Sequence, residues 1–255
     1  MKALMAFAAL AAFAGSAWAD DKEDLLAAAK KTSALKNYSF KGKTTFEPPA
    51  LAGAPVQESP FEGQVDLAEG TRILTDSQEI VRLGEKTAIR PRSGWQVIDE
   101  GRGPGGGPNP GRMTGALGLL AGLRPPRAPH EDMKDLGPKL DKVSKAEKRE
   151  GVGGIDCDVY SFELTAEGAR SAFPGGGMAG RPGAERGNAK FKGCGKAWVG
   201  GDGIVKLDLA SSLSTAFNGN EFEVTSFRSV SLFDLGKTRV EIPEEARKAI
   251  RAKSE

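Results

Sequence analysis

Residues 61–98 read FEGQVDLAEGTRILTDSQEIVRLGEKTAIRPRSGWQVI and decide the fold class of the chain. Phe61, Gly63, Val65 and Leu67 alternate with polar residues, which is the period of a half-buried β-strand. Short apolar runs follow at residues 72–74, 79–83, 87–90 and 95–98, with turn signals every few residues between them. This spacing suits antiparallel strands joined by hairpins and leaves no room for crossover helices. We therefore expect an antiparallel meander here.

The flanking sequence extends this sheet and adds helices. Alternation also predicts strands at residues 38–46, 155–164, 189–199, 204–209, 221–235 and 238–242. Helical spacing and end signals predict helices at residues 20–36, 131–136, 138–150 and 243–252, the third carrying Leu140 and Val143 inward. This order of elements indicates an α+β fold with one large antiparallel sheet, in a single domain spanning residues 20–255.

Two Gly-rich insertions, at residues 101–112 and 173–188, cannot keep regular structure and should be loops. Between the first insertion and Pro125-Pro126 lies an apolar segment, residues 113–123, with Leu117 and Leu120 at helical spacing. This segment is either an ordinary core helix or a movable lid over an apolar cavity. The sequence leaves both readings open.

The first 19 residues, MKALMAFAALAAFAGSAWA, have the features of a secretory signal peptide. Lys2 precedes an apolar run that is too short to span a bilayer, and Ala17-Trp18-Ala19 forms a small-x-small cleavage site. We expect cleavage after Ala19 and a soluble, exported, periplasmic chain that begins at Asp20.

Composition narrows the possible functions. The 255 residues include 36 Lys and Arg against 34 Asp and Glu, and a net charge of +2 gives no general attraction to nucleic acid or to an anionic membrane. We therefore expect no nucleic-acid partner and only peripheral or transient membrane contact.

Catalytic and metal-binding motifs are also missing from the sequence. One His and two Cys cannot build a zinc site without carboxylates. His130-Glu131-Asp132 supplies carboxylates, but neighbours on a helix point in different directions, so we interpret this triplet as a solvated helix start. Neither G-x-S-x-G nor G-x-x-x-x-G-K-[ST] is present. We expect a protein that is not an enzyme and uses no cofactor and no metal.

The two cysteines occupy matching faces of their predicted strands. Cys157 lies opposite the apolar face of Tyr160 and Phe162, and Cys194 lies opposite that of Phe191. Both should face outward, and an oxidising compartment would allow them to pair. We expect a structural disulfide rather than a redox pair, because no C-x-x-C motif is present.

Three further segments carry a family resemblance: YSFKGK at residues 38–43, AWVGGDGIVK at 197–206 and RVEIPEEA at 239–246. With the export signal and the opening helix, they make the chain resemble the outer-membrane lipoprotein carrier superfamily of LolA-like and LppX-like proteins, as a divergent member. The resemblance implies a strongly curved antiparallel sheet, an open half-barrel, whose concave apolar face is covered by helices and receives lipid chains. The arginine with which the carrier holds its lid has no clear counterpart, since Lys41 and Lys43 occupy that region.

We therefore expect an apolar cavity between sheet and helices that binds a lipid or the acyl chains of a lipoprotein, with transport across the periplasm as one use. The expected lining is Phe40, Phe46, Phe61, Val65, Leu67, Tyr160 and Phe162 from the sheet, with Leu117 and Leu120 from the segment above it. The alternative is an envelope protein-interaction or stress-sensing module whose half-barrel is filled by its own helices.

Overall fold

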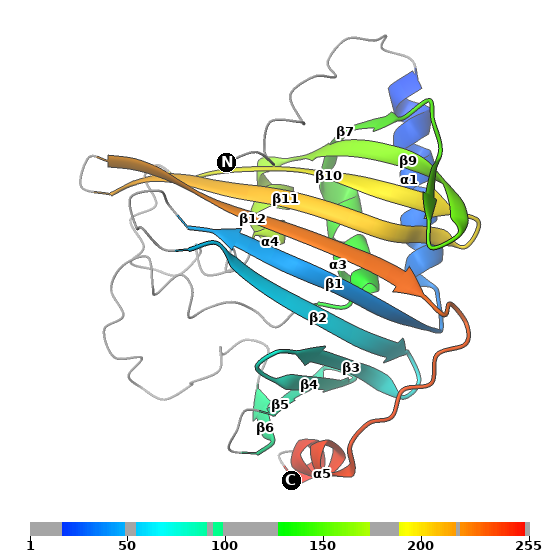
Figure 1. Ribbon diagram of the computed structural model, residues 1–255, viewed down its shortest axis with the longest axis vertical. Helices are drawn as coiled ribbons and strands as arrows, with labels where there is room; N and C mark the ends of the chain where they lie inside the picture. Colours follow the sequence, from blue (N-terminus) through cyan, green and yellow to red (C-terminus); the bar gives the residue numbers. More distant parts are fainter. Residues whose placement is uncertain are drawn as a thin grey trace.

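The computed structural model describes residues 17–48, 55–90, 94–98, 127–173, 189–217 and 220–252. These residues form one open antiparallel sheet of 12 strands (Figure 1). The strands are β1 (Asn37–Glu47), β2 (Gln57–Asp66), β3 (Gly70–Thr75), β4 (Glu79–Leu83), β5 (Lys86–Arg90), β6 (Gln96–Ile98), β7 (Leu140–Lys145), β8 (Glu150–Val152), β9 (Ile155–Leu164), β10 (Lys190–Gly200), β11 (Gly203–Phe217) and β12 (Asn220–Phe233). The predicted α+β fold with one antiparallel half-barrel sheet is confirmed.

The order of the strands shows how the two halves of the chain meet. The sheet runs β6-β5-β4-β3-β2-β1-β12-β11-β10-β9-β7, and β8 pairs with β9 beside this path. The meander β1–β6 is therefore joined to the C-terminal strands by the pairing of β1 with β12, where Phe40 lies opposite Leu232 and Gly42 opposite Val230. The sheet ends at β6 on one side and β7 on the other and does not close.

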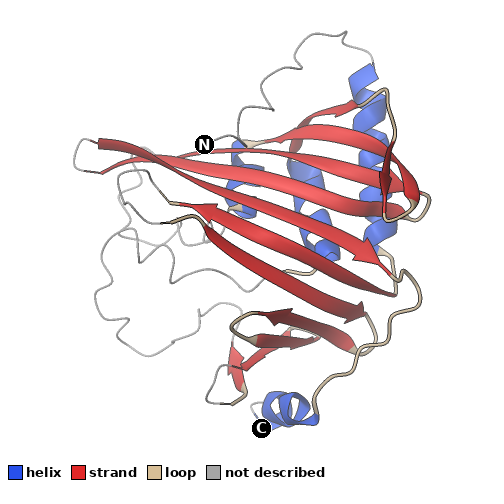
Figure 2. Ribbon diagram, viewed as in Figure 1, coloured by secondary structure: helices blue, strands red, loops and turns tan. Residues whose placement is uncertain are grey.

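Three helices lie on one face of the sheet, which we call the inner face: α1 (Ala17–Ser33), α3 (Pro129–Leu136) and α4 (Ala166–Ala172) (Figure 2). Leu25 and Ala28 of α1 and Met133 of α3 enter the main apolar core with the inward side chains of the strands. Thr165 caps α4 by accepting a hydrogen bond from the N–H of Gly168 at 3.1 Å. No helix was predicted at the position of α4.

The C-terminal helix α5 (Glu244–Ala252) packs on the opposite, outer face. Its Ala246 and Ile250 are buried against Val81 of β4 and Ala88 of β5 in a second, smaller cluster. Helices therefore cover both faces of the sheet at different places. On the inner face α1 and α4 contact strands among β7 and β9–β11, and on the outer face α5 contacts β5 and β6.

Two predicted elements are wrong. Residues 138–150, expected as a helix, form a 3-10 turn (Gly137–Lys139), the strand β7 and the start of β8. Leu140 and Val143 do point inward, but a β-bulge between them in the pairing with β9 produces the spacing of three that imitates a helix. A bulged edge strand can therefore place apolar residues three positions apart, as a short helix does.

The other wrong element is the strand expected at residues 238–242, which is extended chain outside the sheet. Thr238 and Val240 are buried while Arg239 and Glu241 are exposed, so the alternation is real. The Thr238 N–H, however, donates to the Asn37 side chain at 3.1 Å, and its hydroxyl bonds to the Asp234 carbonyl at 3.1 Å. Side-chain and turn contacts thus replace a strand ladder and lead the chain toward α5.

The predicted disulfide is also wrong, because Cys157 and Cys194 are free. Both cysteines lie at outward-facing positions of their strands, as the sequence indicated. The register of β10 on β9 separates them, because Cys194 pairs with Glu163, six residues along β9 from Cys157. Six residues of strand span roughly 20 Å at about 3.3 Å per residue, whereas a disulfide needs Cα atoms about 4.4–6.8 Å apart. Cys157 is instead buried with Val159, Trp198 and Val205.

Several predictions fall outside the described residues. They are the signal peptide up to residue 16, nearly all of both Gly-rich insertions and the whole apolar segment 113–123. The first helix begins at Ala17 rather than residue 20 and ends at Ser33 rather than residue 36. Cleavage after Ala19 stays a prediction.

Candidate functional site

The inner face of the sheet is largely apolar. Alternation along β1, β2 and β9 directs six of the predicted lining residues into the main core: Phe40, Phe46, Phe61, Val65, Tyr160 and Phe162. Small residues make room for them, since Gly63 lies against the Phe40 ring and Gly195 against the Phe162 ring. The structure therefore brings together aromatic side chains from β1, β2 and β9.

The other three predicted lining residues do not join this surface. Leu67 lies just past the end of β2 and is 53% exposed, so it is not part of the apolar face. The alternation seen in the sequence continues one residue beyond the strand, where the chain turns toward β3. Leu117 and Leu120 lie outside the described residues.

The helix α3 lies over this face. Met133 and the preceding Ala128 join the apolar core, and polar contacts hold the first turn of the helix. The Tyr38 hydroxyl of β1 lies 2.5 Å from His130 Nδ1 and also accepts the backbone N–H of His130 at 3.2 Å. The two rings meet edge to face, with centroids 5.9 Å apart. Tyr38 is fully buried, so this pair fixes the first turn of α3 on the sheet.

Two ion pairs hold the same turn from opposite sides. Arg82 of β4 donates to Glu131 Oε2 at 2.5 Å, and that carboxylate also accepts the N–H of Ala128 at 3.2 Å. Arg228 of β12 pairs with Asp132, and a second guanidinium N–H of Arg228 donates to the Arg127 carbonyl at 2.6 Å. Strands from both halves of the sheet therefore grip one short helix.

Burial sets the protonation of this cluster, which we call the α3 clamp (Tyr38, Arg82, Arg228, His130, Glu131 and Asp132). It raises the pKa of Tyr38, so the phenol stays protonated and can donate to His130. It lowers the pKa of His130 against the opposing effects of Glu131 and Asp132, which favours the neutral imidazole that accepts this hydrogen bond. Burial also raises the pKa of Asp132, while Arg228 and Arg127 lower it.

The clamp corrects the interpretation of residues 130–132 as a solvated helix start, since Asp132 is only 8% exposed. In the sequence these are three polar neighbours, but their partners are residues 38, 82 and 228, and no local pattern links those positions to residues 130–132. Among the described residues, no group of three or more His, Cys, Asp and Glu could hold a metal ion.

The arginines of the clamp retain unused hydrogen-bonding capacity. The Nε atoms of Arg82 and Arg228 are buried and make no hydrogen bond within the described part of the chain. Such buried, unpaired donors are uncommon in proteins. Each arginine of the clamp therefore keeps one buried N–H donor that no described residue accepts.

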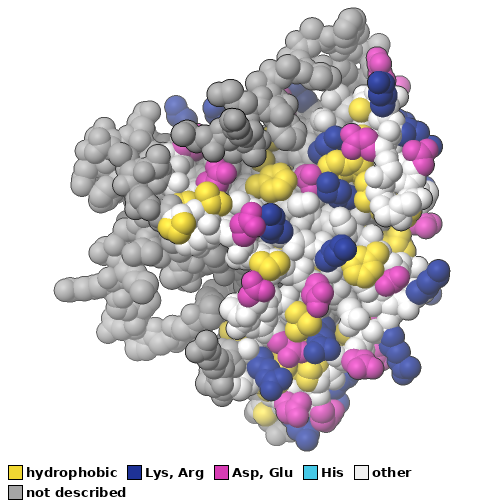
Figure 3. All heavy atoms as spheres, in the orientation of Figure 1, with side chains coloured by type: hydrophobic (Ala, Val, Ile, Leu, Met, Phe, Trp, Pro, Cys, Tyr) yellow, Lys and Arg dark blue, Asp and Glu magenta, His cyan; other side chains and the backbone are white. Residues whose placement is uncertain are grey.

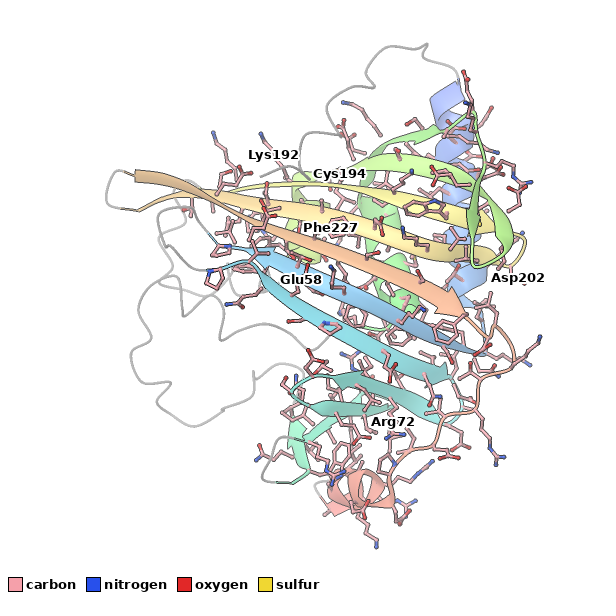
Figure 4. The ribbon with its side chains drawn as sticks, viewed as in Figure 1. Glu58, Arg72, Lys192, Cys194, Asp202 and Phe227 are labelled. Carbon is pink, nitrogen blue, oxygen red and sulfur yellow. The ribbon has the colours of Figure 1, made fainter. Side chains whose placement is uncertain are left out.

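The outer face has a different character. In Figure 3, positively charged lysines and arginines and negatively charged aspartates and glutamates are interspersed with isolated apolar side chains. Figure 4 views the same face, with Glu58, Arg72 and Cys194 among the labelled side chains. Lys41 and Lys43 belong to this face and, with residues of β2, β3 and β12, line a pocket of about 620 Å³. They therefore cannot hold a helix on the inner face.

Comparisons with known proteins give structural matches only. No family model matches the sequence, and no curated protein matches it. The chain is similar in structure to LprF from Mycobacterium bovis, at 11% identity and a TM-score of 0.48, over 89% of this chain and 98% of that one. It is also similar to the lipoprotein LppX from Mycobacterium tuberculosis, at 10% identity and a TM-score of 0.47, over 87% and 99% of the two chains.

A LolA superfamily protein from Nitrosomonas europaea matches at 10% identity and a TM-score of 0.29, over 83% of this chain and 94% of that one. LppX and a LolA superfamily protein, the two kinds of protein that the sequence resembles, are thus among these structural matches. In the parts of the chain that the structure describes, no helix is both long enough and apolar enough to cross a membrane.

Proposed function

We propose that this protein is an exported binding protein that holds a lipid, or the acyl chains of a lipoprotein, between the inner face of its sheet and the helices on it. In this proposal the signal peptide is removed after Ala19, and the folded chain carries its cargo across the periplasm. Envelope proteins would be the donor and acceptor of that cargo.

The way α3 is attached is the observation that carries the proposal. The helix lies over part of the apolar inner face, and Tyr38, Arg82 and Arg228 anchor its first turn by hydrogen bonds and ion pairs. When the helix moves away, water or another polar group can hydrogen-bond the charged groups that it uncovers, whereas the apolar surface beneath needs another apolar group to cover it. A cover attached in this way can move and leave the apolar surface to a ligand.

Burial of the ligand supplies the driving force. Each CH₂ group that leaves water gains about 0.8 kcal/mol, so a long acyl chain can replace the contacts that α3 gives up without any charged group of its own. Aromatic side chains such as Phe46, Phe61 and Phe162 offer large rigid surfaces for such a chain.

A photoreactive diacyl lipid tests the location as well as the binding. The purified protein is incubated with a lipid that carries a diazirine in one acyl chain, irradiated and digested, and the labelled peptides are identified by mass spectrometry. We expect labels at inner-face residues of β1, β2 and β9. Labels confined to the outer-face pocket near Lys41 and Leu74 would contradict the proposed site. A protein that carries no lipid from its host and takes up none would contradict the function.

One observation favours the alternative module. All six described lining residues are already buried in this structure, which is what a self-filled half-barrel would show. In that case the chain would bind an envelope protein through its exposed surface and would ignore lipids. The same labelling experiment separates the two functions.

A further inference from the structure

We infer that Arg82 and Arg228 form a headgroup site for an anionic lipid, so that the ligand of the inner face carries a phosphate or carboxylate beside its acyl chains. This inference rests on the proposed lipid-binding function and specifies its ligand class. The headgroup would take the place of Glu131 and Asp132 on the two guanidinium groups.

Both arginines have hydrogen-bond donors that no described residue uses. A guanidinium presents five N–H donors in a planar fork that suits two oxygens of a phosphate or carboxylate. Arg82 gives one donor to Glu131, and Arg228 gives its donors to Asp132 and the Arg127 carbonyl. Both Nε donors remain buried and without a hydrogen bond among the described residues. A ligand with several oxygens could satisfy more donors than one carboxylate of α3 does.

Arg228 lies directly against the apolar surface. Its guanidinium lies over the ring of Phe61, with 5.2 Å between Cζ and the ring centroid, and Phe61 belongs to the main apolar core. A positive charge is therefore fixed at the border of an apolar face, inside the fold. That juxtaposition matches an amphiphile, whose charged group and hydrocarbon chain are adjacent.

The two ion pairs of the first turn of α3 link the sheet to the helix. Arg82 and Arg228 belong to the sheet, and their carboxylate partners Glu131 and Asp132 belong to α3. An incoming anion would therefore compete with these two carboxylates for the same guanidinium groups. If it displaces the two carboxylates, it also removes the ion pairs that hold α3, which couples headgroup binding to opening of the inner face.

Three small molecules separate the parts of this ligand. Dioleoyl phosphatidic acid has chains and a phosphate, dioleoylglycerol has the same chains alone, and glycerol 3-phosphate has the phosphate alone. Their binding to the purified protein is measured by native mass spectrometry, with the two lipids presented in the same detergent. We expect phosphatidic acid to bind about tenfold or more tightly than dioleoylglycerol, because charge-assisted hydrogen bonds add to the same chain burial. We expect no binding of glycerol 3-phosphate at the same concentrations.

Variants assign the preference to the clamp. Arg228→Gln and Arg82→Gln should each lower the affinity ratio of phosphatidic acid to dioleoylglycerol, and together they should bring it close to one. Because a lone Arg228→Gln leaves the buried Asp132 unpaired, the double variant Arg228→Gln with Asp132→Asn provides a charge-neutral version whose folding is checked by its melting temperature. Arg72→Gln is the matched control, since Arg72 makes a similar ion pair with Glu79, at 2.7 Å, on the outer face. Its ratio should equal that of the wild type.

Each result has one meaning. Equal affinities for the two lipids would overturn the headgroup site and leave the lipid-binding function standing. Binding of glycerol 3-phosphate as tight as that of phosphatidic acid would show an anion site without a lipid role. A preference for phosphatidic acid that survives in the charge-neutral double variant and in Arg82→Gln would place the headgroup elsewhere. Binding of none of the three would contradict the proposed function itself.

Discussion

His130 is the only histidine of the chain, so its protonation can be followed without interference from another imidazole. Its pKa is lowered below the usual value of about 6.5 because burial disfavours the imidazolium form. Tyr38 on β1 and Arg82 on β4 face it from the sheet, and Glu131, Asp132 and Lys134 accompany it on α3. Protonation would give Nδ1 a hydrogen, and this nitrogen could then no longer accept the Tyr38 hydroxyl.

The sign of the resulting pH dependence follows from proton binding. Below about pH 6.5 the unfolded chain binds a proton on His130 before the folded chain does, so stability falls as the pH is lowered through this value. His130→Gln keeps an acceptor for Tyr38 but cannot titrate. We expect the melting temperatures of wild type and variant to converge as the pH drops from about 8 to about 5.5. A difference that stays constant over this range would contradict a neutral, buried His130.

Asp132 opposes this trend. Burial raises its pKa above that of an unfolded Asp, so the folded chain takes up this proton first and gains relative stability as the pH falls. Because Asp132 is present in wild type and in His130→Gln, comparison of the two removes the part of its contribution that does not depend on the charge of His130.

At the scale of elements, local patterns predicted strands well where they belong to regular hairpins. β9 (Ile155–Leu164) matches its prediction at both ends, and the meander from β2 to β6 has the predicted order. Errors arose where long-range pairing decides the outcome. The bulge in β7 and the register of β10 on β9 both depend on which residues meet across strands, and alternation alone cannot supply that.

The candidate site also has a part that the sequence predicts and a part that depends on long-range pairing. Inward-facing aromatic residues such as Phe40 and Phe162 follow from strand parity and could be found from the sequence. The α3 clamp could not, because Arg82, Arg228 and Tyr38 come from three strands that meet only in the folded sheet. The signal available in the sequence is an arginine at a position where the strand alternation predicts an inward side chain. A charged side chain at such a position usually needs a partner of opposite charge.

The helix α5 offers a prediction that belongs to a single element. Ile250 is buried against the outer face of β4 and β5, so Ile250→Ala should destabilise the fold by about 2–5 kcal/mol. Hydrogen exchange should rise in β4–β6 more than in β9–β11, because the main strand contacts of α5 are with β5 and β6. Lys248→Ala, on the exposed side of the same helix, is the control and should change neither quantity much. Equal effects of the two variants would contradict the packing of α5.

At the scale of the whole molecule, the pairing of β1 with β12 decides whether the chain is one cooperative unit. It joins residues about 190 positions apart and is the direct strand-to-strand link between the meander β1–β6 and the strands β9–β12. Without this pairing, the strands would form two separate sheets: the meander β1–β6 with α5, and the strands β7–β12 with α1 and α4. We expect the link to be strong, because Phe40, Gly42 and their partners on β12 lie within the main apolar core or against it.

The tryptophans make this expectation testable, since they report on distant parts of the sheet. Trp95 directly precedes β6 at one edge, and Trp198 lies in β10, with seven strands between β6 and β10. The third tryptophan, Trp18, lies in the predicted signal peptide and is absent from a chain that begins at Asp20. Trp95→Phe and Trp198→Phe therefore each leave one fluorescent reporter in the mature chain, and urea unfolding of the two variants is followed by fluorescence and by far-UV circular dichroism.

In a single domain, fluorescence and circular dichroism should give the same midpoint within each variant, because loss of the β1–β12 pairing and loss of either edge happen together. Each probe is compared with the circular dichroism of its own variant, so a change in stability caused by the substitution does not affect the test. If Trp95 fluorescence changes at lower urea than the circular dichroism of the Trp198→Phe chain, the β3–β6 end with α5 unfolds by itself. The half-barrel would then be two units, and opening of the inner face could proceed by loosening of that end rather than by release of α3.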